Sequence, residues 1–353
     1  MREPRLIVLQ PTPYCNIRCS YCYLRHRDNR ALMSDAVIDA VCEKIVARLP
    51  RDAEPSIVWH AGEPTAAPIS WYRSAYARLL SVSPPGTSYA MQSNGVAIDG
   101  AWIELFRQTS TNVGLSIDGP QRFHDSRRRT RRGGPTWSLA MRALNLLRDA
   151  GLPLNVITVL HPDALDCADE YYRFYRDNGI SNVSFSIDEV EGANAASAFS
   201  GADRKEAVAG FLLELLESAF REGFPLSIRE VERIARVLSG GALAASRNEQ
   251  VIAWDAIVVA HDGSVSTFSP ELMENSAPDF ADFVFGNIVT GDFEDFERNR
   301  AFRLAAAHID AGIAACRSTC RYFEVCGGGS PVNKFCERGD LAAAETDFCR
   351  YST

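Results

Sequence analysis

Short apolar runs alternate with longer amphipathic stretches along the first half of the chain. The apolar runs predict buried strands at residues 5–10, 56–60, 88–92, 112–117, 154–160 and 182–187. The stretches between them have apolar residues at helical spacing and predict helices at residues 36–49, 69–82, 101–108, 137–150 and 168–178. Six strands that alternate with helices are typical of a parallel α/β sheet that is closed or nearly closed into a barrel.

The pattern changes in the second half of the chain. Residues 204–222 and 228–238 predict two helices that bridge the barrel to the segment that follows. Residues 257–268 predict a β-hairpin with Asp262-Gly263 at its turn. We therefore expect a partial barrel at residues 1–200, bridging helices at 201–249 and a C-terminal domain at 250–353.

Polar motifs follow the carboxyl ends of the first four predicted strands. In chain order they are Cys15, Cys19 and Cys22, then Gly62-Glu63-Pro64, then Asn94, then Ser116 and Asp118. A (β/α) barrel builds its active site at this edge of the sheet. Any one of these motifs is compatible with an ordinary turn, but four strand ends together predict one shared site.

The spacing Cys15-x3-Cys19-x2-Cys22 places three thiols in one short loop. Three thiolates can hold three irons of a [4Fe–4S] cluster and leave the fourth iron without a protein ligand, whereas electron-transfer ferredoxins supply four cysteines. The open iron suggests a ligand from outside the protein. A zinc site is the alternative, but structural zinc requires four closed ligands and usually uses Cys-x2-Cys pairs.

A second group of cysteines lies near the end of the chain. Its members are Cys316, Cys320, Cys326 and Cys349, next to Gly327-Gly328-Gly329. Four thiolates would fully ligate a second [4Fe–4S] cluster, and a four-cysteine zinc site is the alternative. Cys336 is a spare thiol that could replace one ligand, whereas Cys42 and Cys167 are expected to be structural.

Composition and charge narrow the class of protein. The 353 residues are 46% hydrophobic and 23% charged, as in ordinary globular proteins. The sequence shows no signal peptide and no apolar run of about 20 residues, so we expect a cytoplasmic protein with no membrane partner. In a reducing cytosol, clustered cysteines bind metal more often than they form disulfides. The net charge of −8 weighs against nucleic acid as a partner.

Two charged segments flank the predicted site. Residues 127–132 (RRRTRR) form either a solvated loop or a docking patch for an acidic peptide, with nucleic acid as a weaker third choice. Asp188-Glu189-Val190-Glu191 follows the sixth strand, and one of its carboxylates could be a general base, although loop solvation explains them as well. The catalytic residues are therefore left unknown.

The first cysteine loop, with Tyr21 before its last cysteine, resembles the hallmark of the radical S-adenosylmethionine (SAM) superfamily. The resemblance implies that the open iron chelates SAM and that one electron cleaves SAM to methionine and a 5′-deoxyadenosyl radical. The implied SAM-binding residues are Gly62 and Glu63 for the amino group, Asn94, Ser116 and Asp118 for the methionine and ribose ends, and Arg128, within His124-Asp125-x-x-Arg128, for the carboxylate.

The C-terminal cysteines resemble the SPASM/Twitch type of auxiliary-cluster domain of radical SAM enzymes that modify peptides. Longer strings resemble the GrrM/OscB-type maturases, which belong to the three-residue cyclophane-forming enzymes. These strings are Pro11-Thr12-Pro13-Tyr14-Cys15, Val58-Trp59-His60-Ala61-Gly62-Glu63-Pro64, Ser266-Thr267-Phe268-Ser269-Pro270-Glu271-Leu272, Gly327-Gly328-Gly329-Ser330-Pro331-Val332-Asn333-Lys334 and Glu345-Thr346-Asp347-Phe348-Cys349-Arg350. The implied fold is a partial (β/α)6 TIM-like radical SAM barrel followed by a SPASM/Twitch-like auxiliary iron–sulfur domain.

This resemblance implies an enzyme that joins an aromatic ring carbon to the β-carbon of a nearby residue in a ribosomally made precursor peptide. The implied cofactors are a SAM-binding [4Fe–4S] cluster, SAM itself, and an auxiliary [4Fe–4S] cluster that accepts or relays an electron. A reductant such as a flavodoxin or ferredoxin would supply the electron that cleaves SAM.

Two other functions are compatible with parts of the sequence. A radical SAM enzyme that oxidises Cys or Ser as sulfatase maturases do, or that forms thioethers, would share the same SAM pocket. A non-catalytic iron–sulfur or zinc scaffold would need no SAM pocket, so the polar motifs at four strand ends count against it.

Overall fold

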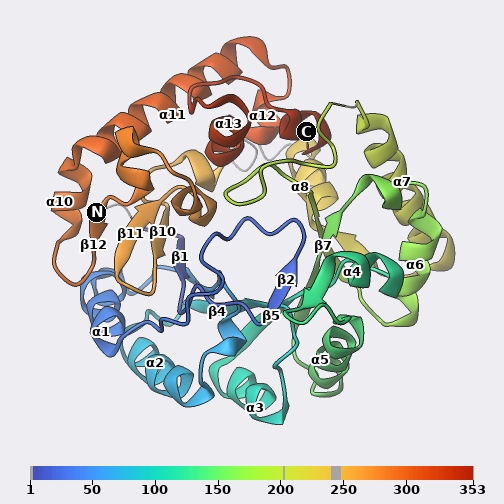
Figure 1. Ribbon diagram of the computed structural model, residues 1–353, viewed down its shortest axis with the longest axis horizontal. Coiled ribbons are helices and arrows are strands. Elements are labelled where there is room, and N and C mark those ends of the chain that lie inside the picture. Colours follow the sequence, from blue (N-terminus) through green and yellow to red (C-terminus); the bar gives the residue numbers. More distant parts are fainter. Residues whose placement is uncertain (1–2, 202, 240–247, 353) are drawn as a thin grey trace.

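The computed structural model describes residues 3–201, 203–239 and 248–352, and a curved sheet of ten strands lies at its centre (Figure 1). In order across the sheet, the strands are β12 (Gly286–Asn287), β11 (Ser264–Thr267), β10 (Ala256–Val259), β1 (Leu6–Leu9), β3 (Ser56–Trp59), β4 (Ser88–Ser93), β5 (Thr111–Ser116), β7 (Leu154–Leu160), β8 (Asn182–Ile187) and β9 (Ser227–Ile228). In this order across the sheet, every neighbouring pair from β10 and β1 through to β8 and β9 is parallel. The remaining two pairs, β10 with β11 and β11 with β12, are antiparallel. All six predicted strands of the barrel are confirmed.

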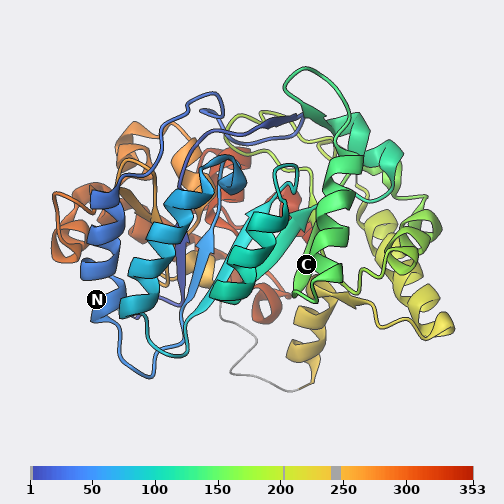
Figure 2. The ribbon, with the colours of Figure 1, turned by 90° about the horizontal axis from the view of Figure 1, so that it is seen from below.

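Helices cover the outer face of this sheet, as Figures 1 and 2 show. They are α1 (Asp35–Lys44), α2 (Ile69–Val82), α3 (Gly100–Thr109), α4 (Gln121–Arg127), α5 (Trp137–Asp149) and α6 (Ala168–Asp177). Five of them match predicted helices, and α4 was not predicted. The two bridging helices are also confirmed, as α7 (Lys205–Glu222) and α8 (Arg229–Leu238).

The core lies between the strands and these helices. Trp59 at the end of β3 is fully buried, and its ring meets Trp71, Tyr72 and Tyr76 of α2 edge-on at centroid distances of 5.6, 5.1 and 5.7 Å. Edge-to-face contacts of this kind add to the free energy gained by burying the rings. The aromatic spacing of α2 thus fixes the helix against the strand that leads into Gly62-Glu63-Pro64.

The C-terminal region joins the barrel sheet rather than standing apart from it. The predicted hairpin is confirmed as β10 and β11, but β10 also pairs in parallel with β1, with Leu6 opposite Ala256 and Leu9 opposite Val259. Arg5 donates to both carboxylate oxygens of Asp255 next to this pairing. The sheet therefore runs across the expected boundary at residue 250, and the division into three domains stays a prediction.

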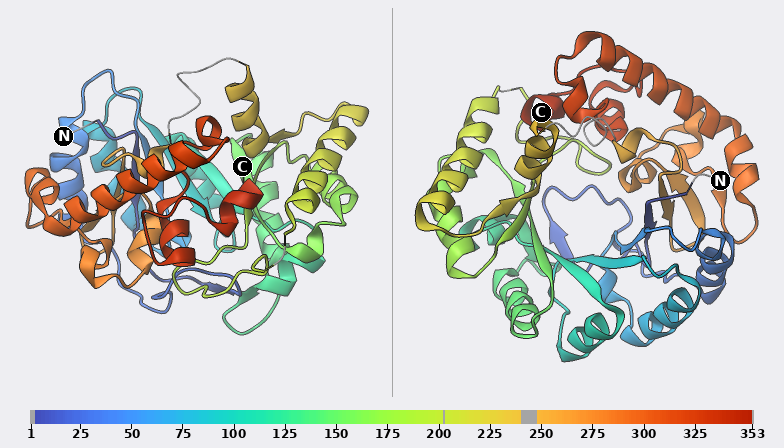
Figure 3. Two further views of the ribbon diagram at one scale, coloured as in Figure 1. Left: turned by 90° about the horizontal axis from the view of Figure 1, so that it is seen from above. Right: turned by 180° about the vertical axis from the view of Figure 1, so that it is seen from behind.

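The rest of the C-terminal region is mostly helical and packs along one side of the molecule (Figure 3). Its helices are α10 (Phe293–Arg298), α11 (Arg300–Thr319), α12 (Phe323–Cys326), α13 (Pro331–Arg338) and α14 (Asp347–Ser352). None of the helices in the described ranges has the length and apolar character that a membrane crossing requires.

The central position of β1 leads to a stability prediction. Ile7 is fully buried and lies between β3 and β10, so Ile7→Ala is expected to lower the free energy of unfolding by about 2–5 kcal/mol. Leu80 on α2 is 47% exposed, and Leu80→Ala should change it by no more than about 0.5 kcal/mol. Urea unfolding measures both, and equal losses would contradict the burial assigned to β1.

Candidate functional site

The cysteine loop follows β1 and is held by a short two-stranded ribbon. Strand β2 (Ile17–Cys19) pairs antiparallel with β6 (Arg128–Thr130), and this pairing sets Cys19 opposite Arg128. The N–H of Cys15 donates to the carbonyl of Arg27 at 3.1 Å, which closes the loop on itself. Figure 2 shows this loop crossing the upper edge of the sheet, where the strands end.

The arginine run at residues 127–132 is largely occupied by contacts within the chain. Arg127 pairs with Asp163 at 2.6 Å, Arg129 donates to the carbonyl of Gly133, and Arg131 donates to the carbonyl of Cys15 at 2.8 Å. These contacts fix the β6 segment and the cysteine loop. They favour neither a free solvated loop nor an open docking patch for an acidic peptide.

Gly62 is required by the cysteine loop itself. Its φ is +55°, and a Cβ at this position would lie 2.3 Å from the carbonyl oxygen of Thr12 and 2.6 Å from that of Tyr14. The next residue, Glu63, donates its N–H to the same Tyr14 carbonyl at 2.8 Å. The absence of a side chain thus lets the β3 loop press against the backbone that carries the cysteines.

The side chain of Glu63 is buried and faces the end of β4. Its carboxylate accepts hydrogen bonds from the N–H and hydroxyl of Thr65, from the hydroxyl of Ser93 at 2.7 Å and from the N–H of Asn94 at 2.7 Å. Burial raises the pKa of Glu63, and these four hydrogen bonds oppose the rise. The hydrogen bonds of Glu63 therefore connect the segment that follows β3 to the end of β4.

Two side chains direct N–H groups toward the cysteine sulfurs. Nδ2 of Asn94 lies 3.8 Å from Sγ of Cys15, and Nη1 of Arg128 lies 3.8 Å from Sγ of Cys19. Burial raises the pKa of Cys15 to about 12, and Glu63, Cys19 and Cys22 contribute smaller rises. The three thiols thus lie close enough to influence one another, and the donors around them suit thiolates that bind a cationic metal cluster.

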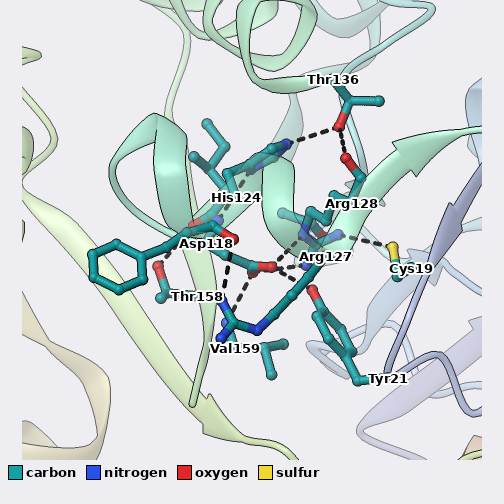
Figure 4. Close-up of polar contacts among 12 residues, drawn as sticks. Cys19, Tyr21, Asp118, His124, Arg127, Arg128, Thr136, Thr158 and Val159 are labelled. Atoms are coloured by element: carbon teal, nitrogen blue, oxygen red, sulfur yellow. Dashed lines mark hydrogen bonds and ion pairs between the residues drawn. The ribbon is translucent and has the colours of Figure 1, made fainter. Parts of the chain in front are cut away.

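Arg128 and Asp118 form a buried ion pair (Figure 4). Nε and Nη2 of Arg128 donate to the two carboxylate oxygens of Asp118 at 2.9 and 3.1 Å, and both residues are almost fully buried. Burial alone would raise the pKa of Asp118, but Arg128 outweighs it and the pKa lies below its usual value. This geometry suits a role for Asp118 in orienting Arg128. Direct contact between Asp118 and SAM stays a prediction.

Three residues around this pair were not predicted as site residues from the sequence. Tyr21 donates its hydroxyl to Asp118 at 2.6 Å, and the buried His124 bonds Thr136, whose hydroxyl donates to the carbonyl of Arg128 (Figure 4). Tyr21 and His124 lie within quoted motifs, so the sequence held a signal for them. Thr136 gave none, because it lies outside every motif.

Ser116 ends β5 and is partly buried. Its hydroxyl accepts a hydrogen bond from Nε2 of Gln92 on β4 at 2.8 Å. Glu63, Asn94, Ser116 and the Asp118–Arg128 pair therefore come from neighbouring strand ends, although their contacts with SAM stay a prediction.

The structure also brings the four C-terminal cysteines together. Burial raises the pKa of Cys316, and Cys326 and Cys320 add to the rise; burial likewise raises the pKa of Cys349, with contributions from Cys326 and Cys316. Lys334 is 2% exposed, and its Nζ lies 3.4 Å from Sγ of Cys316. A buried ammonium group requires negative charge nearby, and four thiolates around an iron–sulfur cluster would supply it.

Cys336 lies apart from this group. Its Sγ contacts Oδ1 of Asn275 at 3.2 Å, and its charged neighbours are Glu337 and Arg25 rather than the other cysteines. We therefore do not count Cys336 among the ligands of the C-terminal group.

Within the described residues, no three His, Cys, Asp or Glu side chains are arranged to hold a single metal ion. Each cysteine of a [4Fe–4S] site bonds a different iron, so its sulfurs lie further apart than the ligands of one ion.

Comparisons with known proteins decide the family. The model of the radical SAM superfamily matches residues 9–175. An uncharacterized Synechocystis protein, sll1766, is 33% identical over 98% of this chain and 88% of its own length. The chain belongs to the radical SAM superfamily. A serine-type anaerobic sulfatase-maturating enzyme of Klebsiella aerogenes is 35% identical over 45% of this chain and 40% of that enzyme.

Solved radical SAM structures share the fold. Native anSMEcpe with bound AdoMet and Cp18Cys peptide superposes with a TM-score of 0.78 at 18% identity, covering 99% of this chain and 94% of that chain. Streptococcus suis SuiB bound to precursor peptide SuiA superposes with a TM-score of 0.68 at 13% identity, covering 98% and 76%. The likeness shows that these proteins share the mostly parallel α/β fold, and it extends over the C-terminal region.

The close packing at Gly62 generates a prediction for this radical SAM site. Gly62→Ala should displace the cysteine loop and lower the iron bound after anaerobic reconstitution, because the new Cβ clashes with two backbone carbonyls. The matched control is Gly100→Ala at the start of α3, where a Cβ meets no atom within 4 Å. Iron and sulfide analysis measures both variants, and equal iron contents in the two would contradict the packing.

The separation of Cys336 from the C-terminal cysteine group generates a second prediction. Cys326→Ala should remove iron from the auxiliary site, whereas Cys336→Ala should leave the iron content unchanged. Iron analysis and electron paramagnetic resonance of reconstituted protein measure the difference. Loss of iron in the Cys336 variant would instead place that thiol in the ligand set.

Proposed function

We propose that this protein is a radical SAM maturase that joins an aromatic ring carbon to a β-carbon in a ribosomally made precursor peptide. The observation that carries the proposal is the second cysteine group, gathered beside the buried Lys334 in the same structure as the radical SAM site. Crosslinking a ring must end with the loss of one proton and one electron, and a second cluster is a suitable electron acceptor. The peptide substrate is supported by the fold shared with peptide-bound anSMEcpe and SuiB.

The residues of the first site would hold the cluster and SAM in the following way. Cys15, Cys19 and Cys22 would each bond one iron, and the bound cluster and SAM would supply the radical that takes hydrogen from the peptide. Asn94 donates toward Cys15, and Asp118 holds Arg128 with one guanidinium nitrogen directed at Cys19. Preorganised donors of this kind lower the cost of binding charged groups.

The choice of a C–C crosslink rests on the resemblance of the long sequence strings to those of GrrM/OscB-type maturases. The test is anaerobic reconstitution of the full chain, followed by reaction with dithionite, SAM and a candidate precursor peptide, sought among short reading frames next to the gene. Mass spectrometry should find deoxyadenosine together with a peptide that has lost two hydrogens for each crosslink. Tandem spectra should then show no fragmentation between the joined residues.

The alternative is oxidation of a Ser or Cys side chain, favoured by the 35% identity to a sulfatase-maturating enzyme over 163 residues. Oxidation of Ser to an aldehyde also removes two hydrogens, so mass alone does not separate the two reactions. An aldehyde-reactive hydrazide does: labelling of the product peptide would support oxidation and overturn the crosslink.

SAM cleavage itself depends on the first cysteine group. Cys22→Ala should abolish deoxyadenosine formation, because the cluster would lose one of its three protein ligands. Cys167→Ala, which changes a thiol on the outer side beside Arg122, is the matched control and should retain the activity. Deoxyadenosine production by the Cys22 variant would remove the basis of the proposed function.

A further inference from the structure

Lys334 on α13 is a buried lysine that faces a cysteine sulfur. Its side chain is 2% exposed, and its Nζ donates to Sγ of Cys316 on α11 at 3.4 Å. Lysine is almost never fully buried unless its charge is paired. In the described part of the chain, Lys334 forms no ion pair with a carboxylate, so its pairing must come from the cysteine group.

The acidic residues that follow Lys334 in the chain bind other groups. The contacts are those of Glu337 with the N–H of Phe348, Asp340 with the N–H of Ala342, Glu345 with Arg350, and Asp347 with Arg338. The partner that the structure gives the ammonium group of Lys334 is therefore the sulfur of Cys316.

Two glycines make room for this ammonium group. Gly312 lies one helical turn before Cys316 on α11, and a Cβ there would lie 2.9 Å from Nζ of Lys334. A Cβ at Gly329 would lie 3.6 Å from Cε of Lys334 and 3.8 Å from Sγ of Cys349. Figure 1 shows α13 beside α11. The end of the lysine side chain thus has a fixed place next to two of the four C-terminal cysteines.

The first cysteine group also has a charged donor, but its charge is compensated. Nη1 of Arg128 lies 3.8 Å from Sγ of Cys19, while Nε and Nη2 of the same guanidinium donate to both carboxylate oxygens of Asp118. This ion pair adds little net charge near Cys19, whereas Lys334 brings an uncompensated positive charge to Cys316. The two cysteine groups therefore differ in the net charge that the protein places beside them.

The reduction potential of an iron–sulfur cluster depends on the net charge around it and on hydrogen bonds to its sulfurs. Reduction adds one negative charge to the cluster. A positive charge beside a ligand sulfur therefore favours the reduced form and raises the potential, and the effect is larger in the protein interior than in water.

We infer that Lys334 raises the reduction potential of the cluster that the C-terminal cysteines would hold, and so makes this cluster the electron acceptor for the peptide. The second part of the inference rests on the proposed function. When the crosslinked ring becomes aromatic again, it loses one proton to water and one electron to the oxidised iron–sulfur cluster. Lys334 is a positioning residue, because it acts through Cys316 and contacts neither the ring nor SAM.

The test measures the potential of the C-terminal cluster alone. The chain is reconstituted with Cys15, Cys19 and Cys22 all changed to Ala, and the remaining cluster is titrated with a reductant and followed by electron paramagnetic resonance. Lys334→Met keeps the length of the side chain and removes its charge. The equilibrium constant for reduction should fall about tenfold, which for one electron moves the midpoint about 59 mV to more negative potential.

Two further variants separate the charge of Lys334 from other effects. Lys205→Met removes an exposed lysine at the start of α7 and should leave the midpoint unchanged. Thr346→Val removes a neutral hydroxyl that donates to Sγ of Cys349 at 3.0 Å, and it should shift the midpoint less than Lys334→Met does. An unchanged midpoint in Lys334→Met, or a larger shift in Thr346→Val, would overturn the inference.

A rescue variant covers the case in which Lys334→Met fails to hold iron. Lys334→Arg keeps a positive charge and should retain the cluster with a midpoint closer to that of the wild type. Iron retained in Lys334→Arg but lost in both Lys334→Met and Lys334→Gln would support a role for the charge. Loss of iron in all three variants would show that Lys334 serves packing alone and would overturn the inference.

Reaction with peptide then distinguishes failure of the inference from failure of the proposed function. With the first cysteine group intact, Lys334→Met should form deoxyadenosine as the wild type does but yield less crosslinked peptide for each deoxyadenosine. A shifted midpoint with an unchanged product ratio would support the charge effect and count against the electron transfer in the proposed function. A fall in the ratio without a shift of the midpoint would overturn the inference.

Discussion

The geometry of the candidate SAM site depends on one buried carboxylate, that of Glu63. Glu63 does not touch a cysteine, yet its carboxylate accepts four hydrogen bonds from three residues, Thr65, Ser93 and Asn94. An ionised carboxylate in the interior would be strongly unfavourable without such partners. Because those partners lie at the ends of β3 and β4, the network fixes both strand ends, and through Asn94 it fixes the donor that faces Cys15.

A second buried charge network orients the opposite side of the cysteine loop. The bidentate pair of Asp118 and Arg128 joins the segment after β5 to β6, and β6 in turn pairs with β2, which carries Cys19. Removing one partner of a buried ion pair leaves an uncompensated charge and typically costs about 3–5 kcal/mol. The cysteine loop is thus held between two polar networks, and the apolar core beneath it supplies the rigidity of the strands.

The strands and most helices could be predicted because their signals are local. Each strand is a short apolar run, and each predicted helix has apolar residues at helical spacing within its own sequence. The pairing of β10 with β1 could not be predicted, because the choice of a parallel partner 250 residues away leaves no local pattern. Helix α11 was missed although its buried residues Phe302, Ala305, Ile309, Gly312 and Cys316 have helical spacing, because alanine and glycine give that spacing little apolar contrast.

The candidate site shows the same division between local and distant signals. The motifs predicted which residues gather at the strand ends, but not which of them bond one another. Arg128 and Asp118 were each assigned to SAM from the resemblance, whereas the structure pairs them with each other. Similarly, the close approach of Gly62 to the backbone of Thr12 and Tyr14 could not be predicted, and the expected contact of Gly62 with SAM stays a prediction. Contacts of this kind follow from the fold rather than from residue type.

The same reasoning applies to the C-terminal region. Its attachment to the barrel is a strand in register with β1, supported by Arg5 with Asp255 and by Lys44, whose Nζ donates to the carbonyl of Gly291 at 2.9 Å. A sheet pairing sets position far more tightly than a flexible linker does, because a slip by one residue would turn every side chain to the other face. Under the proposed function the C-terminal region would take an electron from the peptide, and β10 gives that region a fixed position relative to the barrel.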